Sequence, residues 1–158
     1  ADHSISRRYT AVCAGQPRPA EGTIDARLGR SDRDRKKMAV LDPQSTRGKH
    51  AVTHYRTTKT FGVASILECR LETGRTHQIR VHMAHVGLGL IGDPVYGGRR
   101  KLSEKTHSAR AVMLAAGFGR QALHAASLGF THPATGEKLR FDSPLPADMA
   151  ELLAALRG

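Results

Sequence analysis

The side chains best suited to chemistry lie together in residues 75–80, where the sequence reads Arg-Thr-His-Gln-Ile-Arg. Thr76 can cap a helix there, and Arg80 would then lie about one turn beyond His77 on that helix. The start of a helix also offers free backbone N–H groups, which favour anions. This basic, hydrogen-bonding cluster therefore predicts a place to hold a phosphate or a carboxylate.

A strand, a glycine turn and a helix must position this cluster. Apolar and charged residues alternate over residues 67–72, which is typical of a half-buried strand. Gly74 ends that strand. Apolar side chains then recur at helical spacing over residues 79–86, and Gly87 is placed to stop the helix.

The rest of the chain predicts more strands and a terminal helix. Sequence patterns favour strands at residues 8–15, 51–56 and 123–131, and a short piece at residues 23–25 leads into a basic segment. A turn at residues 132–136 returns the last of these into a hairpin partner that carries Leu139 and Phe141. The terminal helix has an apolar stripe formed by Met149, Leu152, Leu153 and Leu156. Residues 101–120 allow little assignment.

The charge balance indicates a polyanionic partner. The chain has 158 residues, a single-domain length, and a formal net charge of +11. Nucleic acid is the leading candidate, because such an excess would otherwise be self-repulsive. The densest basic segment is residues 27–37, with Arg35, Lys36 and Lys37 at its end, and a second basic loop follows at residues 99–101. The alternative interpretation is that these charge runs are solvated loops.

Other features restrict the class of protein. Cys13 and Cys69 lie among the alternating apolar residues of strands, which indicates reduced core thiols. No apolar run approaches the roughly 20 residues that span a bilayer, and the N-terminus is unlike a signal peptide. We therefore expect a cytoplasmic monomer without a membrane contact. The chain also lacks an initiating methionine, so we expect a portion of a longer protein.

Two motifs carry a resemblance to a known family. Residues 71–82 read Leu-Glu-Thr-Gly-Arg-Thr-His-Gln-Ile-Arg-Val-His, and residues 92–98 read Gly-Asp-Pro-Val-Tyr-Gly-Gly. They resemble the signature of the RluA-type pseudouridine synthases, which isomerise uridine within RNA, and are most similar to the large-subunit ribosomal RNA enzymes. The resemblance implies that residues 1–158 are one domain, the C-terminal portion of the catalytic domain. It also implies an α+β fold with a mixed, largely antiparallel sheet flanked by helices.

The same resemblance implies roles for individual residues. Arg80 matches the arginine that pairs with the catalytic aspartate, and Tyr9 matches the tyrosine that packs against the target base. The aspartate itself belongs to a His-Arg-Leu-Asp motif, and none of the eight aspartates in this chain has those neighbours. We therefore expect this chain alone to be inactive. No cofactor is implied.

Several alternatives remain open. The side chains expected either to contact RNA phosphates or to structure the turn are Arg75, Thr76, His77 and Gln78; Arg35, Lys36, Lys37, Arg99 and Arg100 are expected to contact RNA. The three histidines of this segment do not share one helical face, so we expect no metal site. Asp93, before a proline in a turn, is expected to satisfy local backbone donors. The alternative function is a non-catalytic basic RNA-binding module.

Overall fold

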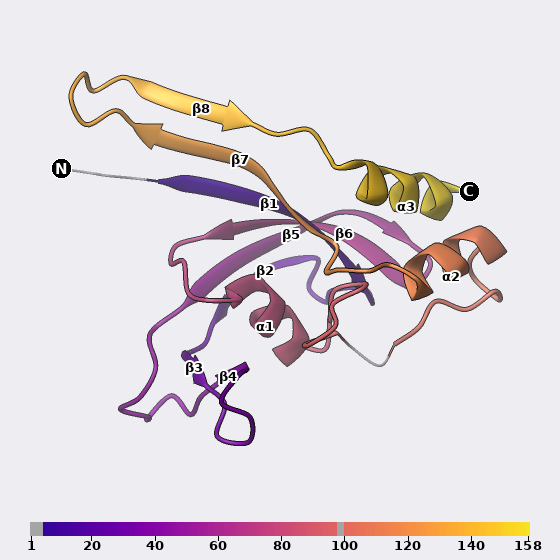
Figure 1. Cartoon of the computed structure of the whole chain (residues 1–158), viewed down its shortest axis with the longest axis horizontal. Helices are drawn as coiled ribbons and strands as arrows, with labels where there is room; N and C mark the ends of the chain where they lie inside the picture. The colour runs from indigo at the N-terminus through magenta and orange to yellow at the C-terminus, as the bar shows by residue number, and fades with distance from the viewer. Residues whose placement is uncertain (1–4, 98–99) are drawn as a thin grey trace.

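The computed structural model describes residues 5–97 and 100–158, and its centre is a six-stranded sheet in the order β2–β5–β6–β1–β7–β8 (Figure 1). The strands are β1 (Ser6–Ala14), β2 (Glu21–Asp25), β3 (Leu28–Arg30), β4 (Met38–Val40), β5 (Val52–Phe61), β6 (Ala64–Leu71), β7 (Leu123–Thr131) and β8 (Lys138–Asp142). The helices are α1 (Gln78–His85), α2 (Ala109–Ala116) and α3 (Ala147–Arg157). The expected α+β class is confirmed, and every strand pair described is antiparallel.

Strand β1 lies between β6 and β7 and is buried on both faces along its second half. Ala11 and Cys13 point into the core beneath α1, whereas Val12 and Ala14 point into the core beneath α2 and α3. The alternation expected from the sequence is thus confirmed, with an apolar cluster on each side. The two clusters fix the sheet between α1 on one face and the α2–α3 pair on the other.

Helix α1 follows β6 through a short turn and ends at the predicted glycine. Gly87 has φ of 81°, and its N–H bonds to Ala84 O while the N–H of Leu88 bonds to Met83 O. These two bonds are the Schellman arrangement that left-handed glycine favours. The predicted cap at Thr76 is wrong: the N-cap is His77, in the left-handed region at φ 55°, and makes no side-chain cap bond.

Two elements were not predicted. Helix α2 begins after Ser108, whose hydroxyl accepts from the N–H of Ala111 at 3.1 Å, and α2 packs on α3. The two-stranded sheet β3–β4 docks on α1 through an apolar cluster of Leu28, Ala51 and Val81 with Met38, Val40 and Tyr96 packed against it. In the described residues, no helix is long and apolar enough to cross a membrane.

Candidate active-site cluster and nucleic-acid interface

Arg80, in the first turn of α1, forms a buried two-point ion pair with Asp93. Its Nε donates to one carboxylate oxygen at 2.9 Å and its Nη2 donates to the other at 2.9 Å. The side chains are 9% and 0% exposed, respectively. Parallel N–H···O bonds of this kind fix the plane of the guanidinium as well as its position. The hydrogen bond and charge of Asp93 raise the pKa of Arg80, so the group stays cationic.

The turn at residues 92–96 explains why Asp93 faces the helix. The backbone N–H groups of Val95 and Tyr96 both donate to Asp93 Oδ1 at 3.0 Å, which confirms the expected bonding to local donors. The pairing with Arg80 was not expected. Burial alone would raise the pKa of Asp93, but the bonds from Arg80 and from these two N–H groups outweigh it and lower the pKa.

Tyr96 completes the cluster. The Arg80 guanidinium lies 5.0 Å from the centre of the Tyr96 ring, within cation–π range. The Tyr96 hydroxyl accepts from the N–H of Met38 at 2.9 Å and is 2.9 Å from Nδ1 of His77. Desolvation of the imidazole and the charge of Arg80 lower the pKa of His77. Since the Tyr96 hydroxyl already accepts from Met38, a neutral His77 would accept a hydrogen bond from the Tyr96 O–H at Nδ1.

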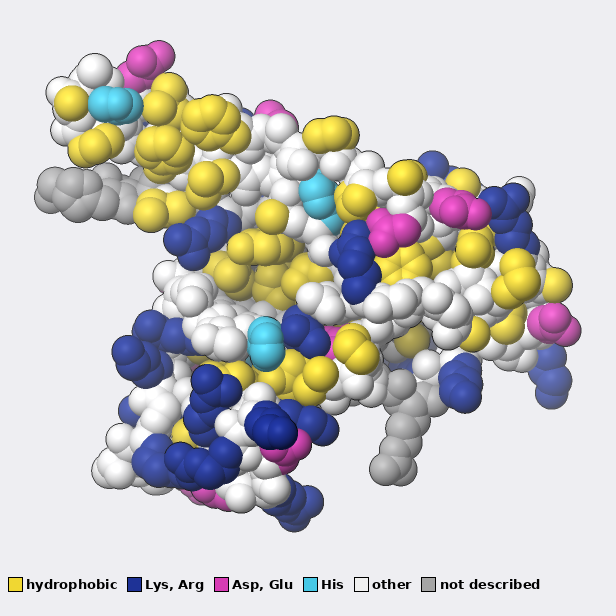
Figure 2. All heavy atoms as spheres, in the orientation of Figure 1, with side chains coloured by type: hydrophobic (Ala, Val, Ile, Leu, Met, Phe, Trp, Pro, Cys, Tyr) yellow, Lys and Arg dark blue, Asp and Glu magenta, His cyan; other side chains and the backbone are white. Residues whose placement is uncertain are grey.

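One edge of Arg80 remains available. Asp93 takes the Nε and Nη2 side, and no acceptor within the described residues bonds to Nη1. Tyr9 in β1 packs against the cluster that contains Ile79, the neighbour of Arg80, together with Leu123. Figure 2 shows hydrophobic side chains in a hollow between the β1–β7 region and the start of α1, with basic side chains at its rim. The arrangement provides a fixed cation beside an apolar surface.

Of the two roles left open for Gln78, its hydrogen bonds favour the one in the turn. It is 2% exposed, its Nε2 donates to Val52 O and to Thr53 Oγ1, and its Oε1 accepts from Thr73 and Arg75. Thr53 Oγ1 in turn lies 2.8 Å from Nδ1 of the buried His82. This network holds α1 on β5, so we leave Gln78 out of the proposed RNA contacts.

Burial lowers the pKa of His82, whose Nε2 donates to Ala26 O at 2.9 Å. Both of its ring nitrogens are therefore occupied by protein atoms. Over residues 5–97 and 100–158, no group of three or more His, Cys, Asp or Glu side chains is arranged to hold a metal ion.

The geometry can be compared with known proteins. The sequence pattern of the family described as RNA pseudouridylate synthase matches residues 1–85. The chain belongs to this family. A ribosomal large subunit pseudouridine synthase D of Zymomonas mobilis is 53% identical over 156 residues, which cover 99% of this chain and 46% of that protein. The protein of the same description from Pseudomonas aeruginosa is 49% identical over 154 residues, covering 98% and 46%.

A solved structure described as human RNA pseudouridylate synthase domain containing 4 shares the fold, with a TM-score of 0.74 and 24% identity. The similarity covers 97% of this chain and 62% of that one. The chain thus spans about half the length of the curated family members that it matches. Family membership agrees with the resemblance carried by the two motifs.

The basic residues expected to contact RNA fall in different places within this family member. Arg35, Lys36 and Lys37 are exposed in the loop between β3 and β4, where Figure 2 shows basic side chains gathered. A hydrogen bond from Met38 to Tyr96 connects the β3–β4 sheet to the cluster formed by Arg80, Asp93 and Tyr96. Arg75 donates from Nε to His50 O at 2.9 Å. Thr76 is exposed beside it.

The second basic loop is separate from that surface. Arg99 lies outside the described residues, and Arg100 lines a cavity at the other end of α1. Sequence reasoning overlooked Tyr96, although it lies within the motif at residues 92–98. Its position four residues after Gly92 gives no indication that it reaches Arg80, because that contact depends on tertiary packing.

Proposed function

We propose that this chain supplies the arginine side of the active site of an RNA pseudouridine synthase that acts on large-subunit ribosomal RNA. The observation that carries the proposal is the half-occupied guanidinium of Arg80. Asp93 fixes its Nε–Nη2 edge, and its Nη1 side is left for a second carboxylate or an anion. The names of the relatives favour ribosomal RNA as the substrate.

The reaction requires a carboxylate that this chain lacks. Isomerisation breaks the bond from ribose C1′ to uracil N1 and forms a bond from C1′ to C5, after which C5 loses its proton and N1 gains one. The resemblance assigns the essential carboxylate to a His-Arg-Leu-Asp segment. Arg80 would keep that carboxylate ionised and aimed, because a charged partner lowers the pKa of a carboxyl group. Tyr9 would pack against the base.

Asp93 is a poor substitute for the missing carboxylate. Its side chain is fully buried, and its two oxygens accept four hydrogen bonds from Arg80, Val95 and Tyr96. A carboxylate held in this way cannot reach ribose C1′ without first breaking the pair. We therefore assign Asp93 to positioning Arg80 rather than to attack on the substrate.

RNA would be held mainly through phosphates. The exposed side chains of Arg35, Lys36 and Lys37 carry charge without an aromatic neighbour in their loop, so they suit backbone contact better than base stacking. His77 is exposed beside Tyr96 and would be a further polar contact for the RNA. Together these groups would contact the phosphates of an RNA strand that runs from the β3–β4 surface to Arg80.

The test is release of tritium from RNA that carries [5-³H]uridine. We expect none above background from the 158-residue chain, and release from a longer protein that also contains the His-Arg-Leu-Asp segment. Release by the chain alone would contradict the assignment of the carboxylate. Absence of release by the longer protein, with RNA bound, would favour the non-catalytic RNA-binding module.

A further inference from the structure

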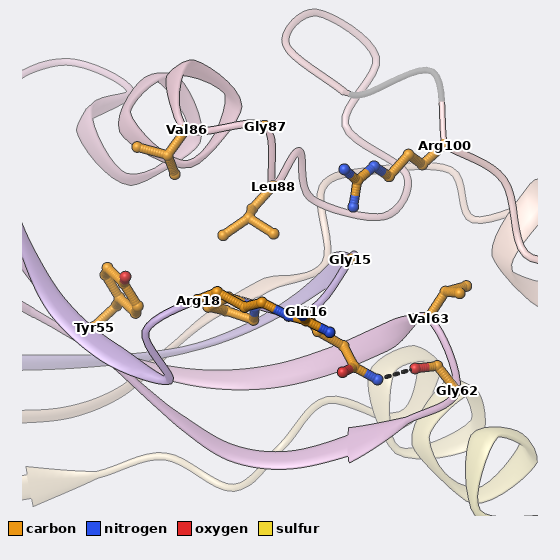
Figure 3. A pocket seen from close by; sticks show the side chains of 11 residues that line it. Gly15, Gln16, Arg18, Tyr55, Gly62, Val63, Val86, Gly87, Leu88 and Arg100 are labelled. Atoms are coloured by element: carbon orange, nitrogen blue, oxygen red, sulfur yellow. Dashed lines mark hydrogen bonds between the residues drawn. The ribbon is translucent and has the colours of Figure 1, made fainter.

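A cavity of about 660 Å³ lies at the C-terminal end of α1, away from the Arg80 cluster (Figure 3). Its walls come from the end of β1, the β5–β6 turn, Tyr55 of β5 and the residues that follow α1. They are Gly15, Gln16, Pro17, Arg18, Tyr55, Gly62, Val63, Val86, Gly87, Leu88 and Arg100. Tyr55 packs on the same apolar cluster as Ile79 and Met83, so the cavity lies on the α1 face of the sheet.

The charged groups of this cavity have one sign. Arg18 and Arg100 reach it from two separate loops, and no Asp or Glu is among the lining residues. Neither arginine forms an ion pair within the described part of the chain. Arg100 lies across Gly15: a Cβ at Gly15 would be 2.7 Å from its Nη1, and the glycine has φ of 129°. The backbone there is shaped to let the guanidinium approach.

Several other side chains that line the cavity are apolar. Val63 and Val86 are 38% and 44% exposed, and the side chains of Leu88 and Tyr55 line the space beside them. Figure 3 shows Tyr55 at one end of the cavity and Val63 at the other, with Arg18 between them and Arg100 above. Inorganic phosphate would contact the arginines and leave these apolar side chains exposed to water. A nucleotide would use both, because its base has an apolar face and its phosphate is anionic.

We propose that this cavity binds a nucleotide of single-stranded RNA other than the target uridine, with its phosphate between Arg18 and Arg100 and its base against Tyr55 and Leu88. The proposal rests on the proposed function only in taking RNA as the source of the nucleotide. Arg80 and Gly87 are seven residues apart on or beside α1, which is roughly 10 Å along a helix axis. One RNA strand can therefore occupy both places.

The first test adds a carboxylate to the cavity and compares it with the same change elsewhere. Val86→Glu places the charge on the cavity wall, whereas Met113→Glu places it on α2 at a side chain that is 66% exposed and does not line the cavity. The probe is uridine 5′-monophosphate, titrated into the 158-residue chain and followed by amide chemical shifts. We expect Val86→Glu to weaken binding at least about tenfold and Met113→Glu to change it by less than about twofold.

The second test removes the two cations. Arg18→Ala with Arg100→Ala should weaken the nucleotide at least about tenfold, whereas Lys138→Ala with Arg157→Ala removes the same charge from β8 and α3 and should change it by less than about twofold. Uridine and inorganic phosphate are titrated separately, and each should bind more weakly than the nucleotide. A melting curve for each variant confirms the fold.

Equal nucleotide binding by the cavity variants and the wild type would overturn the proposal. Inorganic phosphate binding as tightly as the nucleotide would also overturn it, because the cavity would then be an anion site alone. A single-stranded oligoribonucleotide bound equally by the Arg18/Arg100 double variant and its control would show that RNA does not use the cavity. These results are independent of tritium release, so the site and the proposed function fail separately.

Discussion

Replacing Asp93 by alanine removes the acceptor of four hydrogen bonds: two from Arg80 and one each from the N–H groups of Val95 and Tyr96. Arg80, whose side chain is 9% exposed, would be left as an unpaired buried cation. Breaking a buried pair from one side costs about 3–5 kcal/mol of the free energy of unfolding, because the remaining charge is uncompensated. We expect Asp93→Ala to lower the free energy of unfolding by an amount in this range.

Asp142→Ala is the matched control. The Arg140–Asp142 pair has the same N···O distance of 2.9 Å, but its side chains are 65% and 64% exposed. An exposed pair contributes less than about 1 kcal/mol, so the free energy of unfolding of this variant should be close to that of the wild type. The measurement is urea unfolding of the chain, comparing midpoints at constant slope.

A double-mutant cycle gives the pairwise energy. Arg80→Ala alone leaves Asp93 buried without its cation, whereas Arg80→Ala with Asp93→Ala leaves neither charge. We therefore expect the double variant to lose less than the sum of the two single losses, by on the order of 2–3 kcal/mol. Additive losses, or a loss below about 1 kcal/mol for Asp93→Ala, would refute the reasoning.

The pair also makes a pH prediction. The pKa of Asp93 is lowered in the folded chain, so the folded state favours the ionised carboxylate. Its contribution to stability is fully present above the ordinary carboxyl pKa of about 3.9 and is lost as pH falls through the lowered folded value. The stability difference between the wild type and Asp93→Asn should therefore be constant from about pH 5 to 7 and shrink below about pH 4. A difference that grows on acidification would contradict this sign.

Two further predictions concern the surface and the core. Lys36→Ala and Lys37→Ala should each weaken RNA binding and reduce the slope of log affinity against log salt by about 0.7 if a phosphate contact is lost; an unchanged slope would remove that lysine from the interface. Burial raises the pKa of both Cys13 and Cys69 to about 12, so neither thiol should react with a disulfide reagent in the native chain, although both should in urea; rapid native labelling of either would contradict its burial.

Local patterns predicted much of the fold. The alternation of apolar and polar residues was sufficient to predict β1 and β6, because successive side chains of a strand point to opposite faces of the sheet. Leu67 and Cys69 of β6, two residues apart, therefore enter the same core cluster. Helix α3 and the β7–β8 hairpin were also predicted correctly. Helix α2 was missed. The cap at Thr76 was misplaced by one residue, because the N-cap is His77, in a left-handed conformation that non-glycine residues rarely adopt.

The candidate site was predictable only where a motif is contiguous. Residue types and spacing placed Arg80 and His77 in one cluster, and the resemblance supplied the expected role of Arg80. The position of Asp93 opposite Arg80 depends on how the turn at residues 92–96 packs on α1, which neither periodicity nor charge reveals. The sequence left the role of Gln78 open between RNA contact and the turn, because its buried partner Thr53 lies 25 residues away in the chain.

The most direct test of the proposed role of Arg80 is single-turnover tritium release by a longer protein that contains both this chain and the His-Arg-Leu-Asp segment, with Arg80→Lys compared with Arg75→Lys. Lysine keeps the charge but has no second edge, so it cannot hold Asp93 and a second carboxylate in fixed planes. We predict that Arg80→Lys sharply lowers the rate with nearly unchanged RNA affinity, once melting curves confirm folding, and that Arg75→Lys does less. Normal turnover by Arg80→Lys would contradict the account.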